Sequence, residues 1–193
     1  MTYFEYEAVY FGIIVGLALA NILMSFHKLI EARSRVRWGW FAPLSALYAA
    51  VLTLGEFWSL WVRQRDLGHD IFLSWLPTAF AFALVFLMCA ASLPDEAGEA
   101  VDLKRYYMEN RYRFWGFSAA LHALNLCSWT ISFFEQGSEP HFLVSHLHPI
   151  AGNVVEGALS LSLIFVRATW WQVLGFAAIW VYALSYFGPL PLH

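Results

Sequence analysis

Residues 8–30 read AVYFGIIVGLALANILMSFHKLI. The stretch contains no acidic residue, and its only Lys or Arg is Lys28, near its end. A helix of about 20 apolar residues crosses the ~30 Å hydrocarbon core of a bilayer, so a run of this length predicts a membrane span. Small residues recur at every fourth position (Gly12, Gly16 and Ala20), which is typical of a face that packs against another helix.

Five further stretches share this length and apolar composition: residues 39–62, 72–93, 114–134, 147–166 and 168–188. Together with residues 8–30 they predict an all-α fold, a polytopic membrane helical bundle with six transmembrane helices in a single membrane domain covering residues 1–193. Only the turn around Arg167 separates the last two stretches. One long, kinked or re-entrant element is the alternative there.

The overall composition agrees with a membrane protein. The chain is 60% apolar and 13% charged, whereas soluble domains average about 45–50% and about 25%. Aromatic residues make up 19% and include ten Trp, which is typical of proteins at a lipid–water boundary. A net charge of −3 offers no basic surface for nucleic acid. These figures argue against a soluble enzyme, a disordered chain and a nucleic-acid binder.

The basic residues predict how the six spans are oriented. Of eleven Lys and Arg, four lie in the first loop, four in the third and one in the fifth, leaving only Arg63 and Arg65 for the opposite side. Cytoplasmic loops of membrane proteins carry the excess of Lys and Arg. We therefore expect a multi-pass protein of a bacterial inner membrane with both termini outside.

The only sizeable polar segment, residues 94–113, is expected to be a cytoplasmic interfacial linker. Pro94 ends a helix, and residues 101–108 then predict a short helix on the membrane surface. Its basic residues alternate with Tyr and fit either anionic lipid headgroups or a docking partner: Lys104, Arg105, Arg111 and Arg113. The linker separates two three-span halves of opposite orientation, a topology that suggests a 3+3 inverted arrangement.

Ionisable residues inside the predicted spans mark the candidate site. Glu156 lies near the middle of the fifth span and Glu56 about two turns from the outer end of the second. An ionisable group at mid-membrane costs about 2.5–3.5 kcal/mol, so such residues are expected to face the protein interior or a cavity.

The fourth span carries a polar stripe, whose members recur in steps of four and three: Ser118, His122, Asn125, Trp129 and Ser132. This spacing places them on one side of a helix. At similar depth we expect a polar cluster that lines a hydrated path or a small binding site: Glu156, His122, Asn125, Asn153 and Asn21. In the alternative interpretation, a protonated Glu156 hydrogen-bonds His122 or Asn153 and merely holds the bundle together.

No metal, cofactor or catalytic motif is expected. The histidines nearest to a ligand set are His141, His146 and His148, but a spacing of two residues before a proline is not a familiar metal signature. The chain contains no Gly-x-Ser-x-Gly, no His-Glu-x-x-His and no glycine-rich phosphate loop. We assign no catalytic residues, and an enzyme is the less favoured interpretation.

Several segments of the first half together resemble a known group of proteins: residues 33–38 (RSRVRW), 56–61 (EFWSLW), 93–94 with 102–103, and 106–111. On these residues the chain is similar to a family of small bacterial six-span integral membrane proteins. The resemblance covers roughly the first 115 residues. It implies the six-span topology and carries no activity.

Three functions follow from these patterns. The leading hypothesis is a channel or transporter that passes a proton or small cation through the mid-membrane polar cluster, with Glu56 as an outer entry site. The alternative is a non-catalytic membrane subunit or scaffold that docks a partner through a cytoplasmic helix at residues 99–113. The third is an intramembrane enzyme acting on lipid. Membrane lipids and further copies of the chain, in a homo-oligomer, are the expected partners.

Overall fold

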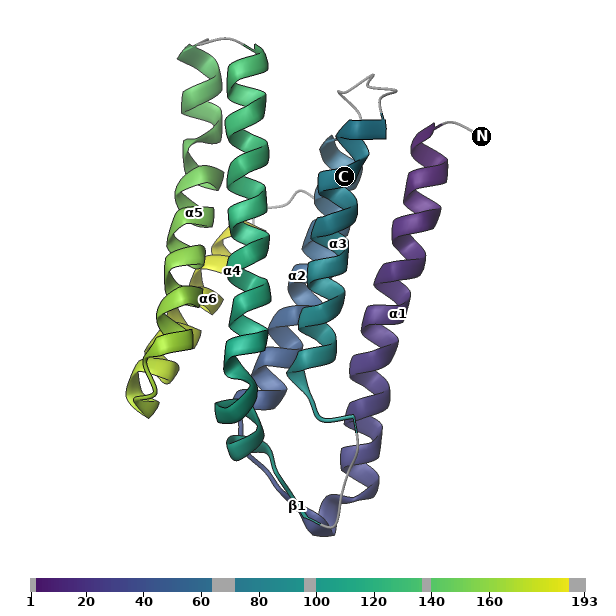
Figure 1. Cartoon of the computed structure of the whole chain (residues 1–193), viewed down its shortest axis with the longest axis vertical. Helices are drawn as coiled ribbons and strands as arrows, with labels where there is room; N and C mark the ends of the chain where they lie inside the picture. The colour runs from purple at the N-terminus through teal and green to yellow at the C-terminus, as the bar shows by residue number, and fades with distance from the viewer. Residues whose placement is uncertain (1–2, 64–71, 96–99, 137–139, 188–193) are drawn as a thin grey trace. The chain divides into compact units, whose positions relative to one another are not determined.

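The computed structural model describes residues 3–63, 72–95, 100–136 and 140–187. The described part contains six helices (Figure 1): α1 Tyr3–Glu31, α2 Phe41–Arg63, α3 Phe72–Ser92, α4 Leu103–Gln136, α5 Pro140–Phe165 and α6 Thr169–Phe187. A 3-10 turn, Arg33–Arg35, precedes the two-residue strand β1, Val36–Arg37, which pairs with β2, Val101–Asp102. The predicted all-α fold is confirmed.

The boundary between α5 and α6 bears on the alternative given for residues 147–188, and the beginning of α4 corrects the prediction for residues 101–108. Residues 166–168 separate α5 from α6, so the chain forms two helices there and not one uninterrupted helix. The short surface helix expected at residues 101–108 is also wrong, because residues 103–113 form the first turns of α4. No Pro or Gly interrupts the chain from Leu103 to Arg113, and the Asp102 carboxylate accepts a hydrogen bond from the Arg105 backbone N–H at 3.0 Å. Asp102 thus caps the beginning of α4, and the helix continues without interruption into the apolar residues that follow.

The chain forms two compact units, Met1–Phe114 and Trp115–His193. The division falls within α4, after Phe114, whereas the sequence predicted a single domain with its internal boundary in the 94–113 linker. The first unit holds α1, α2, α3 and the beginning of α4. The second holds the rest of α4 with α5 and α6.

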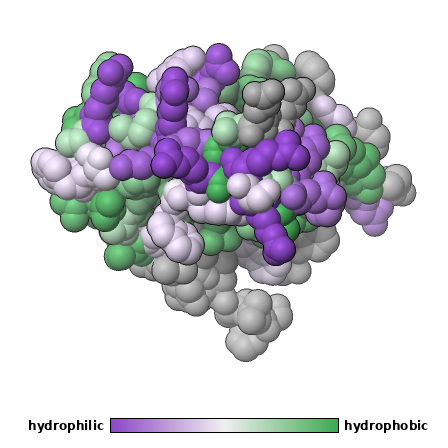
Figure 2. Space-filling model, turned by 90° about the horizontal axis from the view of Figure 1, so that it is seen from below, coloured by the Kyte–Doolittle hydropathy of each residue, from purple (hydrophilic) through white to green (hydrophobic). Residues whose placement is uncertain are grey.

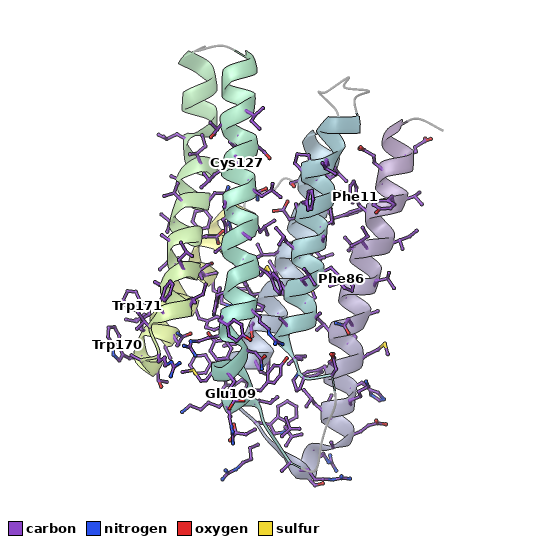
Figure 3. The ribbon with its side chains drawn as sticks, in the orientation of Figure 1. Phe11, Phe86, Glu109, Cys127, Trp170 and Trp171 are labelled. Carbon is purple, nitrogen blue, oxygen red and sulfur yellow. The ribbon has the colours of Figure 1, made fainter. Side chains whose placement is uncertain are left out.

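In the first unit, α3 packs against both α1 and α2, and α1 also contacts α2. Phe11 of α1 points towards α3 (Figure 3) and stacks on Phe82 with 4.4 Å between ring centroids. Thr53 of α2 lies 3.4 Å from the sulfur of Cys89 on α3. Both Cys89 and Cys127 are free thiols, and Cys89 is buried whereas Cys127 is exposed.

The start of α4 is fixed to the rest of the first unit by backbone pairing. β1 and β2 are parallel, with Val36 opposite Val101 and Arg37 opposite Asp102. The chain after β1 then passes close to α4, because a Cβ added at Gly39 would lie 2.9 Å from the Lys104 backbone nitrogen. Glycine is therefore required at position 39 by this close approach.

Tyr106 ties α4 to the end of α3. Its hydroxyl donates to the Leu93 carbonyl at 3.0 Å, beyond the last residue of α3. Burial raises the pKa of Tyr106 to about 12, and the nearby Asp95 carboxylate contributes to the rise, while Arg113 opposes it.

In the second unit, the turn between α5 and α6 is held by side chains of α6. The buried Gln172 amide donates to the carbonyls of Leu163 at 3.1 Å and Val166 at 2.6 Å. The Trp171 indole N–H donates to the Ser162 hydroxyl at 3.1 Å. The two bonds from Gln172 satisfy carbonyl groups that the end of α5 leaves without helical partners.

Within the described residues, two helical segments are long and apolar enough to cross a membrane, Glu7–Glu31 and Phe41–Leu60. Two more apolar segments are shorter, Leu76–Ser92 and Ile150–Phe165. α1 also exposes large apolar side chains along its length, including Val9, Ile13, Leu17, Leu23 and Met24. A contiguous apolar face of this kind is uncommon on soluble monomers and is typical of a surface that contacts lipid or another protein.

We expect Phe11→Ala to destabilise the first unit by about 3–5 kcal/mol, because it removes a fully buried ring stacked on Phe82. Denaturant unfolding of the purified protein in detergent measures the loss. Ile13→Ala is the control, since Ile13 lies on the same helix but is 59% exposed. Equal stability of the two variants would contradict the packing of α1 on α3.

We expect Tyr106→Phe to cost about 1 kcal/mol at neutral pH through loss of the bond to Leu93. Because the folded pKa is raised to about 12 from the ordinary 10, the neutral hydroxyl stabilises the fold fully below pH 10. That contribution declines as pH rises from 10 towards 12. Wild-type stability measured between pH 8 and 12 should therefore fall more steeply than that of the variant, and parallel curves would refute the assignment.

Candidate functional site

Within the second unit, polar side chains of α4 meet polar side chains of α5. The hydroxyls of Ser118 and Ser160 lie 3.0 Å apart, and His122 Nδ1 lies 3.0 Å from Asn153 Oδ1. His122 Nε2 lies 3.5 Å from Glu156 Oε2. We call these five residues the α4–α5 polar cluster.

The contacts of the cluster follow an antiparallel register between the two helices. Ser118 faces Ser160, and His122, four residues later on α4, faces Glu156, four residues earlier on α5. A step of four residues is about one helical turn, so the two pairs are stacked about 6 Å apart along the helix axes. Two residues of the predicted polar stripe of α4, Ser118 and His122, therefore face polar residues of α5.

Four of the five residues of the cluster are buried, and Asn153 is half-buried. The side chains of His122 and Glu156 are only 4% and 8% exposed, and both serines are fully buried. α5 presents Gly157 to the imidazole, since a Cβ added there would lie 3.4 Å from the Cβ of His122. A larger residue at position 157 would compete with the imidazole for this space.

The hydrogen bond to Asn153 determines where His122 carries its proton. The amide oxygen of Asn153 only accepts, so Nδ1 of His122 must be the donor. Nε2 is then the nitrogen that gains or loses a proton, and it forms no hydrogen bond with the described residues. The carboxylate of Glu156 is 3.5 Å away. The pair can therefore hold one proton either on the imidazole or on the carboxyl group.

Of the other residues expected at this site, one lies further along α4 and two lie in the first unit. Asn125 is half-buried and lies about one turn beyond His122 on α4. Asn21 on α1 and Glu56 on α2 belong to the first unit, so the cluster formed inside the second unit contains neither. The structure thus brings together His122, Asn153 and Glu156 of the predicted set.

Sequence reasoning missed the partner of Ser118. Ser160 lies four residues after Glu156 on α5 and hydrogen-bonds across to Ser118 on α4. Gly152 instead faces α6, where an added Cβ would overlap the Tyr182 hydroxyl. The sequence did contain a signal for this contact. Ser118 and His122 are four residues apart on one helix, and Glu156 and Ser160 are four apart on the other, so the two pairs face each other when the helices are antiparallel.

The three histidines considered for a metal lie in α5, which begins at Pro140 rather than near residue 147. The side chains of His141, His146 and His148 fall outside the described residues. Among the side chains that the structure describes, no group of three or more His, Cys, Asp or Glu could hold a metal ion.

The four basic residues predicted to bind lipid headgroups or a partner differ in how exposed they are. Lys104, Arg105 and Arg113 are exposed at the beginning of α4. Arg105 bonds Glu109 at 2.7 Å, and this contact raises the pKa of its guanidinium. Arg111 is only 8% exposed and donates to the Met108 carbonyl, so a surface role for Arg111 does not fit the structure.

Comparison of the chain with family models, with curated proteins and with solved structures found no match. The resemblance to small bacterial six-span proteins therefore stays an expectation, and function has to be argued from the geometry of the site.

We expect Gly152→Ala to destabilise the second unit by about 1–3 kcal/mol, because the new methyl group would displace Tyr182 and separate α5 from α6. Thermal unfolding in detergent measures the effect. Gly116→Ala is the matched control, since nothing lies within 4 Å of a Cβ there and alanine favours the helix. Adding Tyr182→Ala should relieve the overlap. A stable single variant would show that the two helices are not so closely packed.

Proposed function

We propose that the chain is a six-span integral membrane protein of a bacterial inner membrane, with both termini outside, that passes a proton or small cation through the α4–α5 polar cluster. Support for the membrane comes from the two apolar segments long enough to span and from the exposed apolar face of α1. The excess of Lys and Arg in alternate loops supports the orientation.

The observation that carries the proposal is the buried pair of His122 and Glu156, 3.5 Å apart, with the second imidazole nitrogen held by Asn153. Each group can exist neutral or charged, and a proton moved from one to the other changes both charges together. An imidazole fixed in one tautomer gains and loses its proton at Nε2, the nitrogen that faces Glu156, so the proton exchanges between two defined atoms. Exchange of a proton between such a pair is one of the steps that proton passage through the cluster would use.

The roles of the residues follow from this geometry. Glu156 is the titrating or ion-binding carboxylate, His122 relays the proton, and Asn153 fixes the tautomer of His122. Asn125 and Asn21 supply further dipoles along the path, and Glu56 is the outer entry residue. These last three assignments rest on the sequence pattern.

A second candidate, a membrane subunit that docks a partner through residues 99–113, is favoured by one observation. Lys104, Arg105, Tyr112 and Arg113 are all exposed at the beginning of α4. Replacing Arg105 and Arg113 by Gln would then release a co-purifying protein, whereas Glu156→Gln would not.

The deciding experiment is ion flux into liposomes that contain the purified protein, measured between pH 5 and 8. We expect wild-type flux above that of empty liposomes and at least a tenfold loss in Glu156→Gln, which keeps the shape of the carboxyl group but cannot titrate. His122→Gln should lose flux to a similar extent. Glu109→Gln is the matched control, because Glu109 is exposed and lies outside the cluster.

Each variant is first checked for helix content and a monodisperse elution profile, so that loss of flux is not loss of folding. Equal flux in wild type and Glu156→Gln would leave Glu156 as a structural hydrogen-bonding group. A wild type that conducts no better than empty liposomes would reject ion passage and leave the subunit as the better hypothesis.

A further inference from the structure

The β1–β2 pairing gathers basic residues that are distant in sequence at one end of the first unit. Arg33, Arg35 and Arg37 lie in the segment that contains β1, and Lys104 follows β2 at the start of α4. All four side chains are exposed. We call them the basic surface. Figure 2, which views the end where β1 lies in Figure 1, shows hydrophilic side chains gathered there.

The cations of the basic surface form no ion pair with any described residue, whereas the neighbouring described acids are engaged elsewhere. Glu31 lies 3.5 Å from His27, and Glu109 bonds Arg105 at 2.7 Å. Asp102 accepts the Arg105 backbone N–H at the beginning of α4. This end of the unit therefore presents positive charge that these acids do not neutralise.

Two tryptophans adjoin the basic surface directly. Trp38 and Trp40 follow β1 and are 50% and 83% exposed, although rings of this size are normally covered. Trp38 also meets the ring of Phe26 on α1 edge to face, at 6.1 Å between centroids. Indole rings of this kind are enriched at the headgroup level of membranes.

The preceding helix supplies an apolar surface beside the charges. The last turns of α1 expose Leu23, Met24, Phe26 and Ile30, a few residues before Arg33. Trp38 and Trp40 come after the three arginines in the chain, but Trp38 contacts Phe26 of α1, so apolar, aromatic and cationic side chains are exposed together at this end of the unit. A phospholipid carries the same three kinds of chemistry in its acyl chains, glycerol and phosphate.

We propose that the basic surface binds the headgroup of an anionic phospholipid. The guanidinium groups of Arg33, Arg35 and Arg37 and the ammonium of Lys104 pair with the phosphate, Trp38 and Trp40 lie at the level of the glycerol, and the acyl chains follow the exposed side of α1. The proposal rests on the membrane location argued above, but not on ion passage.

The apolar and aromatic neighbours distinguish a lipid from a soluble anion. A free phosphate or phosphorylated metabolite would use the four cations and gain nothing from two exposed indoles or from α1. A lipid would contact the four cations, the two indoles and the exposed apolar side chains of α1. Basic residues close to an anionic leaflet each strengthen binding about fivefold, and the effect falls with salt.

The test uses the full chain in a neutral detergent, with phosphatidylglycerol and phosphatidylcholine as the added lipids. Native mass spectrometry counts the bound lipids, and thermal unfolding measures the stabilisation that each lipid gives. We expect phosphatidylglycerol to bind at least tenfold more tightly than phosphatidylcholine. The triple variant Arg33→Gln, Arg35→Gln, Arg37→Gln should lose about 100-fold in affinity for phosphatidylglycerol, since three fivefold steps multiply.

The matched control is a triple variant with the same change of net charge, Arg63→Gln, Arg65→Gln, Arg167→Gln, which leaves the basic surface and the basic residues at the beginning of α4 intact. Its affinity should stay within a fewfold of wild type. Trp40→Ala should weaken phosphatidylglycerol binding without affecting salt dependence. Equal binding of the two lipids, or equal losses in the two triple variants, would overturn the proposal.

Two further measurements distinguish lipid binding from the binding of a soluble anion and from ion passage. Glycerol phosphate at millimolar concentration should not displace the lipid, and displacement would reassign the surface to a soluble anion. Glu156→Gln should bind phosphatidylglycerol as wild type does, whether or not it conducts ions. Failure of ion passage therefore leaves this inference standing, and loss of lipid selectivity leaves ion passage to its own test.

Discussion

The second unit depends on one constraint, that polar groups enclosed between helices must find partners inside the protein. His122 and Glu156 are almost fully buried, and an unpaired group there would cost several kcal/mol. The Asn153 amide, the Glu156 carboxyl group and the two serine hydroxyls are the partners that α4 and α5 supply to each other. Their spacing fixes the register of the helix pair, because a shift by one residue would separate every polar contact at once.

The helices themselves were predictable because each contains a long apolar run ended by Pro, Gly or charge. The full length of α4 was not, and Leu103 to Arg113 shows why. Hydropathy locates the part of a helix suited to a membrane, but the helix continues as long as nothing interrupts it and its first turn is capped. Asp102 provides the cap, and no Pro or Gly intervenes. The polar turns before the apolar run were therefore mistaken for a separate surface helix.

The site was predictable only in part, for a related reason. Periodicity within one helix places Ser118 and His122 on one face, but the pairing of that face with Ser160 and Glu156 depends on how α4 lies against α5. The four-residue step common to both helices is visible in the sequence, but the face of α5 that meets α4 is not. The burial of Arg111 was not predicted either, because its charge and its place in a basic segment indicated an exposed residue. Packing within the fold instead buries its side chain and directs it to the Met108 carbonyl.

The chemistry of the cluster also bears on whether it merely holds α4 against α5. Apolar side chains of similar size hold buried helices together at least as well as an ionisable pair, and replacing such a pair by apolar residues is often neutral or stabilising. A purely structural contact therefore does not require a carboxyl group 3.5 Å from an imidazole. It also does not require Asn153 to restrict the imidazole to one tautomer. Uncharged hydrogen bonds such as that between Ser118 and Ser160 are enough to fix the helix register. A proton that moves between His122 and Glu156 gives the ionisable pair a role beyond this, and this is why we favour transport over a structural role.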